Sequence, residues 1–242
     1  MRNHMTYILI GSVAALISGC HPATRVVRPP AASETRQVAA ASGTHAACAA
    51  SLADCPMEGC GGDRIDAGTN VQKNRTEVPA TTELLSVAQF KQRFREKTDI
   101  PTSRESLSNS DKSALVEEES NGVTVEGVIL DYAKEGVESC NCYVPDAKDF
   151  HVWLGADLST DKWNSIVVEL TPRIFDTSDR SISTTLGRLK KDHTRVRVVG
   201  WPTFDPLHPT EVGDTRYSRW EVHPILDIQT QSDGGDWVSI FE

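Results

Sequence analysis

The alternation of apolar and polar residues after Gly122 is the feature that most restricts what this chain can fold into. Side chains on a β-strand alternate between its two faces. Five segments have this pattern: Val123–Leu130, Phe150–Leu154, Ser165–Thr171, Arg195–Trp201 and Arg219–Gln229. Between the third and fourth segments, apolar residues at 182, 186 and 189 have helical spacing. The sequence therefore predicts a mainly β domain over residues 122–242 with one internal helix.

Five strands with a helix between the third and fourth resemble the OB-fold, a small, partly open Greek-key barrel. Short motifs add a second resemblance, to a family of small exported bacterial lipoproteins to which no activity is attached, over residues 55–242. The motifs are Glu138–Cys142, Val167–Arg173, Val199–Trp201, Asp205–His208 and Trp220–Pro224. The resemblance implies a five-stranded OB-like barrel and no particular chemistry.

Residues 55–121 are predicted to be a cysteine- and glycine-rich loop followed by a helical lead-in. The loop runs from Cys55 to Asp63. Ser86 and Gln89 have the spacing of a capping box, and Leu85 and Phe90 stand where a hydrophobic staple needs them, which predicts a helix start at Ser86. A weaker helical pattern follows over 111–119.

The first 20 residues are expected to be a lipoprotein signal peptide. The apolar run from Tyr7 to Ile17 is too short to span a bilayer as a mature helix. Small residues before Cys20 resemble a lipobox, in which the cysteine becomes the first residue and carries acyl chains such as palmitate. The alternative is a plain secretory signal. His21, rather than an aspartate, favours an outer membrane facing the periplasm in a diderm host.

Residues 21–54 are predicted to be a disordered linker between the bilayer and the folded part. They are rich in Ala, Pro, Ser and Thr and carry few bulky apolar side chains. Such a segment cannot bury enough surface to offset the entropy lost on ordering.

The cysteines after the anchor are expected to form disulfides, because exported proteins keep such bonds. Five cysteines follow Cys20, so one is expected to stay unpaired. Cys48, which lies in the predicted linker, is expected to be that one. The disulfide candidates are Cys55, Cys60, Cys140 and Cys142, and their three connectivities cannot be separated by sequence. The alternatives are a four-cysteine zinc knot and a redox pair. A staple between the Cys55–Cys60 loop and the Cys140–Cys142 loop is the simplest interpretation.

Three histidines, each with a carboxylate nearby, form the candidate chemical site. Asp149 with His151 and Glu221 with His223 are same-face pairs on strands, and Asp205 precedes His208 by three residues. The candidate metal ligands are His151, Glu169, His208 and His223, with Asp149, Asp205 and Glu221 orienting them. Imidazoles and carboxylates suit a divalent cation such as zinc. A buried hydrogen-bonded network without a metal is the alternative.

The net charge of the predicted β domain further restricts the possible classes of function. Residues 122–242 carry twelve Lys and Arg against twenty Asp and Glu, which is not the electrostatic footprint of a nucleic-acid binder. The sequence favours a non-enzymatic binding or structural module of the cell envelope, with the bilayer, an envelope protein or a small ligand as partner. A metal-dependent hydrolase, in one form nuclease-like, is the alternative.

The lipobox-like motif predicts that Cys20→Ala releases the mature chain from the membrane fraction or blocks its processing, because the acylated residue is lost. Membrane fractionation and the intact mass of the chain measure this. Unchanged membrane association with unchanged mass would contradict the anchor.

Overall fold

The computed structural model describes residues 46–60, 67–232 and 234–241. The helices are α1 (Ala67–Lys73), α2 (Val87–Arg93), α3 (Asn109–Glu118) and α4 (Arg180–Lys191), with short 3-10 turns at Leu52–Asp54, Arg104–Ser106 and Lys162–Asn164. The strands are β1 (Thr82–Ser86), β2 (Gly122–Lys134), β3 (Phe150–Gly155), β4 (Ile166–Leu170), β5 (Arg195–Phe204), β6 (Trp220–Gln231) and β7 (Trp237–Ser239). Within these residues, no helix has the length and apolar composition needed to cross a bilayer.

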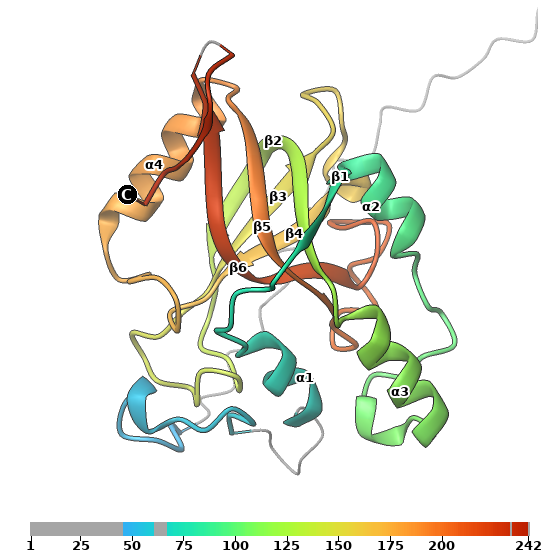
Figure 1. The fold of residues 1–242 in the computed structure, drawn as a ribbon. Coiled ribbons are helices and arrows are strands. Elements are labelled where there is room, and N and C mark those ends of the chain that lie inside the picture. The colour runs from blue at the N-terminus through green and yellow to red at the C-terminus, as the bar shows by residue number, and fades with distance from the viewer. Residues whose placement is uncertain (1–45, 61–66, 233, 242) are drawn as a thin grey trace, which may run out of the picture. The chain divides into compact units, whose positions relative to one another are not determined.

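Five strands close into a barrel in the order β2-β3-β4-β6-β5, and β5 pairs back with β2. All neighbours are antiparallel except β4 and β6, which are parallel. The helix α4 lies between β4 and β5 in the chain and packs against β2 (Figure 1). The predicted mainly β fold, its five-stranded barrel and its internal helix are therefore confirmed. The added strands β1 and β7 extend the sheet beside β2 and β6.

The barrel core is built from alternate residues of each strand, as the sequence pattern requires. On β3 these are Phe150, Val152 and Leu154, and on β4 they are Ile166, Val168 and Leu170. The apolar face of α4, predicted from its four- and three-residue spacing, is buried as well. Because strand side chains alternate, the residues between these face the outside of the barrel, where the candidate site lies.

The predicted capping box at the start of α2 is present. Ser86 accepts from the backbone of Gln89, whose side chain accepts in return from the Ser86 backbone N–H. The tilted rings of Phe90 and Phe94 then pack with centroids 4.6 Å apart, and the Phe94 centroid lies 4.9 Å from that of Trp220 on β6. The lead-in helix is thus joined to the barrel core through aromatic packing.

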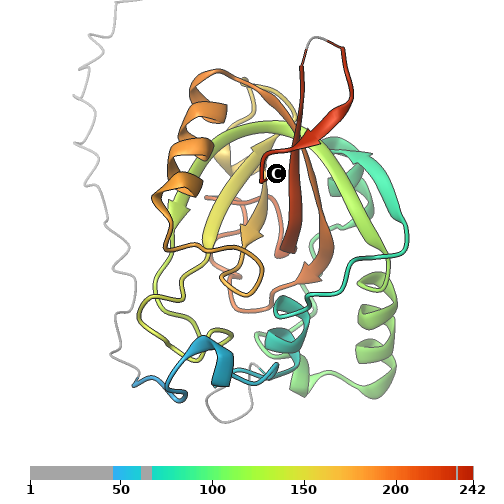
Figure 2. The ribbon, with the colours of Figure 1, turned by 60° about the vertical axis from the view of Figure 1, so that its left-hand side comes forward.

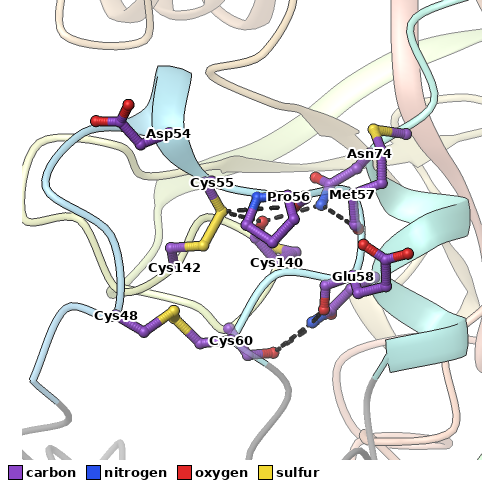
Figure 3. Close-up of a disulfide and its surroundings, with 12 residues drawn as sticks. Cys48, Asp54, Cys55, Pro56, Met57, Glu58, Cys60, Asn74, Cys140 and Cys142 are labelled. Atoms are coloured by element: carbon purple, nitrogen blue, oxygen red, sulfur yellow. Dashed lines mark hydrogen bonds between the residues drawn. A yellow bond between two sulfur atoms is a disulfide. The ribbon is translucent and has the colours of Figure 1, made fainter.

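The cysteines correct part of the sequence prediction. Cys48 pairs with Cys60, and Cys55 pairs with Cys142, with Cα atoms 5.9 Å and 5.8 Å apart (Figure 3). Cys140 is the buried free thiol, so the predicted spare was the wrong cysteine. Residues 46–54 belong to this stapled loop, so the predicted linker ends before Cys48. Its remaining residues 21–45, and the predicted signal peptide with Cys20, lie outside the described residues.

Hydrogen bonds fasten the stapled loop to both the barrel and α1. Arg173, just after β4, donates to the carbonyls of Cys55, Pro56 and Cys140. Asn74, at the end of α1, donates to the carbonyls of Met57 and Cys140 (Figure 3). Both ribbon views show residues 46–60 beside α1 and under the β2–β3 loop (Figure 2). The lead-in and the barrel are therefore one structural unit.

This connectivity predicts the outcome of non-reducing peptide mapping. Bonds Cys48–Cys60 and Cys55–Cys142 should be found, and the Cys140 thiol should be alkylated only after unfolding, because it is buried. Loss of the Cys55–Cys142 bond in a Cys55→Ser variant should lower the free energy of unfolding by roughly 2–4 kcal/mol. The control is Cys140→Ser, which should keep both bonds. A bond to Cys140 would contradict this pattern.

Candidate functional site

Three of the four predicted metal-ligand candidates form a row on the outer face of the barrel. His151 on β3 lies directly opposite Glu169 on β4, and the parallel pairing of β4 with β6 brings His223 to the other side of Glu169. The Glu169 oxygens lie 2.7 Å from Nε2 of His151 and 3.0 Å from Nδ1 of His223. One carboxylate thus bridges two imidazoles across three strands.

The fourth candidate, His208, lies beside this row without joining it. Its ring centroid is 6.3 Å from that of His151. Its own nitrogens contact other carboxylates, with Nδ1 2.8 Å from Glu211 and Nε2 3.4 Å from Asp205. His208 therefore has two acidic partners of its own in the β5–β6 loop.

The carboxylates predicted to orient the ligands are fully buried. Asp149 lies with Oδ2 3.5 Å from Nε2 of His223, while its Oδ1 accepts a 2.8 Å hydrogen bond from Asn141. Glu221 lies 3.3 Å from Nδ1 of His223. Asp149, Glu169, Asp205, Glu221 and His223 have no solvent exposure.

Two cations that sequence reasoning missed complete the cluster. Lys73, the last residue of α1, places Nζ 2.6 Å from Asp205 and 3.8 Å from Glu221. Arg216, from the β5–β6 loop, contacts Glu221 at 3.1 Å and Glu211 at 3.0 Å. No local motif marks either residue. The only sequence signal was indirect, because buried carboxylates require buried positive charge.

Glu138 and Glu135, on the β2–β3 loop, lie at the margin of the cluster. Glu138 is 3.7 Å from Nζ of Lys73, and Glu135 is 3.3 Å from Nδ1 of His151. Both are more exposed than the strand carboxylates, with side chains 25% and 30% accessible. They form the side of the cluster nearest solvent.

The pKa shifts follow from burial and from this pairing. Burial raises the pKa of Asp149 to about 7, and Glu138 adds to the rise. Burial alone would lower the pKa of His223, but the Glu169 carboxylate outweighs it and raises that pKa to about 10. Burial likewise opposes ionisation of Glu169, yet the two imidazoles hold its pKa well below the usual range. The protonation of each of these groups thus depends on the charges of its neighbours in one network.

The segments that cover the cluster separate it from solvent. Lys73 lies on α1, Glu138 on the β2–β3 loop, and Arg216 on the β5–β6 loop. His151 is 6% exposed and His223 is not exposed. In this conformation a substrate cannot reach the Glu169–His223 pair.

Comparison of the chain with family models, with curated proteins and with solved structures found no match.

The buried ion pair predicts a large loss of stability on Lys73→Met. The change leaves Asp205 and Glu221 buried without their ammonium partner, so the free energy of unfolding should fall by about 3–5 kcal/mol. Urea unfolding measures it. Adding Asp205→Asn to Lys73→Met should restore part of the loss.

The matched control is Lys190→Met, which removes an exposed partner of Asp131. A surface pair of this kind is worth about 1 kcal/mol or less. An equal effect of the two substitutions would show that the Lys73 pair does not hold the lead-in on the barrel.

Proposed function

We propose that this protein is a lipid-anchored binding module of the cell envelope, tethered through Cys20, in which the helical lead-in of an OB-like barrel contacts another envelope protein. The observation that carries the proposal is the burial of the histidine–carboxylate cluster beneath α1 and the β2–β3 and β5–β6 loops. A catalytic side chain has to contact its substrate. The described contacts of the cluster side chains are with one another.

The strand connectivity supports the OB-like part of the proposal. OB barrels bind ligands on the face of their second and third strands, between the loops that follow the first and fourth strands. The corresponding strands here are β3 and β4, and the loops are residues 135–149 and 205–219. Lys73 of α1 contacts Asp205, in the second of these loops, and Glu221 on the neighbouring strand β6. The lead-in thus borders the usual ligand position, which favours a partner surface elsewhere.

An open hollow between α1 and α3 offers such a surface. Its volume is about 290 Å³, and it is lined by Gly68, Val71, Gln72, Arg104, Glu105, Leu107, Lys112, Leu115 and Val116. The apolar floor and the charged rim are typical of binding sites. Val116 at its edge is 51% exposed, which is the kind of apolar contact point that a protein partner covers.

A hydrolase remains the alternative, and the network of His151, Glu169 and His223 is its only support. A metal-bound water would be the nucleophile. The burial of Glu169 and His223 gives a substrate no entry in this conformation, so the geometry favours binding over catalysis.

The proposal is tested by placing a photo-crosslinking amino acid at Val116 in the full-length protein in cells. We expect one dominant adduct with another envelope protein. The matched control is the same probe at Leu158, a β3–β4 loop residue with a similar 54% exposure, which should give no such adduct.

Two results would contradict the proposal. One is an equal adduct pattern at both positions, or none at either. The other is turnover of ester or phosphodiester substrates by the purified protein with Zn²⁺ or Mn²⁺ that is abolished by Glu169→Gln.

A further inference from the structure

The charges of the buried cluster do not balance through its permanent ion pairs. Four carboxylates of the cluster are fully buried: Asp149, Glu169, Asp205 and Glu221. Lys73 pairs with Asp205 at 2.6 Å, and Arg216 pairs with Glu221 at 3.1 Å. Asp149 and Glu169 have no lysine or arginine within ion-pair distance among the described residues. Two buried negative charges therefore need another source of positive charge.

These two carboxylates and His223 also converge on one point. Each of the three offers a ligand atom, and the three atoms lie within 4.8 Å of one another. Nε2 of His223 is buried and has no hydrogen-bond partner among the described residues. It lies 3.5 Å from Oδ2 of Asp149, which is longer than a good N–H···O hydrogen bond. Two ligands of one zinc ion are separated by roughly 3.4 Å at ordinary bond lengths.

The ligand groups are held in place by their surroundings. Asn141 donates to Oδ1 of Asp149, which leaves Oδ2 directed at His223. Glu169 lies on β4, which is paired on one side with β3 and on the other with β6. The Glu169 oxygens lie 2.7 Å from Nε2 of His151 and 3.0 Å from Nδ1 of His223, and within the described part of the chain neither contact has hydrogen-bond geometry. Outer contacts that orient a ligand while leaving its binding atom free are usual around protein-bound metals.

We propose that Asp149, Glu169 and His223 bind one divalent transition-metal cation, Zn²⁺ or Mn²⁺, as a structural centre. Two carboxylates and one imidazole suit these ions, and the double charge neutralises the two unmatched carboxylates. Because the site is buried, the ion enters as the lead-in closes on the barrel, and its binding energy adds to folding stability. The ligand set differs from the one expected from sequence, since Asp149 replaces His151 and His208.

Protons are the competing source of positive charge. The carboxylates that surround His223 raise its pKa to about 10, after the opposing effect of burial. A doubly protonated His223 with a protonated Asp149 would also leave the cluster balanced. This alternative predicts a protein that binds no metal and is indifferent to chelators.

The test uses the full-length protein purified after export, with its metal content measured by inductively coupled plasma mass spectrometry. We expect close to one Zn²⁺ or Mn²⁺ per chain. Protein refolded with EDTA should lose the ion, and adding ZnCl2 or MnCl2 during refolding should raise Tm by roughly 5–10 °C at a free ion concentration 100-fold above Kd. MgCl2 should have a smaller effect.

Asp149→Asn and Glu169→Gln keep the size of each side chain and remove the charge. Each should weaken ion binding by more than the roughly 10- to 100-fold that loss of an outer hydrogen-bond partner causes. In metal-free protein, Asp149→Asn should not lower Tm, because it removes an unmatched buried charge. This result separates loss of ion binding from misfolding, because a misfolded variant would have a lower Tm than wild type in the absence of metal as well.

The control is Glu135→Gln, which alters a carboxylate that contacts His151 and none of the proposed ligands. It should bind the ion as wild type does. The proposal is overturned if wild-type protein takes up no Zn²⁺ or Mn²⁺ during refolding. It is equally overturned if Asp149→Asn and Glu169→Gln bind the ion as tightly as wild type, because the ion then sits elsewhere on the chain.

Discussion

The rest of the structure depends on the ion pairing of a lysine that is buried against the outer wall of the barrel. An ammonium group that has left water needs acidic partners, and Lys73 has three, of which Asp205 is the nearest at 2.6 Å. The next two residues extend the same attachment. Asn74 donates to the carbonyl of Cys140 on the β2–β3 loop. Arg75 donates to the carbonyls of Glu119 and Pro202, and its guanidinium lies over the ring of Trp201. Three consecutive polar residues thus join the lead-in to both sheet and loop.

Much of the barrel was predictable because its information is local. Alternating apolar residues predict a strand, and each of β2 to β6 contributes such residues to the barrel core. The same parity placed Asp149 with His151 and Glu221 with His223 on one face of their strands. The predicted elements are correct where a run of residues carries its own period.

What the sequence did not reveal depends on contacts between distant segments. The helix α1 has one bulky apolar residue, Val71, and forms because its polar side chains find partners in the barrel. Lys73 and Arg216 enter the site from segments whose position is set by tertiary packing, so neither has a local signal. The cysteine pairing is likewise a property of the folded chain, and the pairing found, Cys48–Cys60 with Cys55–Cys142, is none of the three patterns that the four predicted cysteines permit. Cys48 was misassigned because the composition around it resembles a linker.

The two disulfides cross each other along the chain, because the partner of Cys55 comes 82 residues after Cys60. A chain that enters an oxidising compartment from its N-terminus exposes Cys48 and Cys55 first. Oxidation in order of arrival would join these two, and that bond has to be broken before Cys55 can reach Cys142. For a chain exported as proposed, conversion of that bond into the native pair requires thiol–disulfide exchange. The crossed pattern then makes the yield of native protein depend on disulfide isomerisation as well as on the stability of the fold.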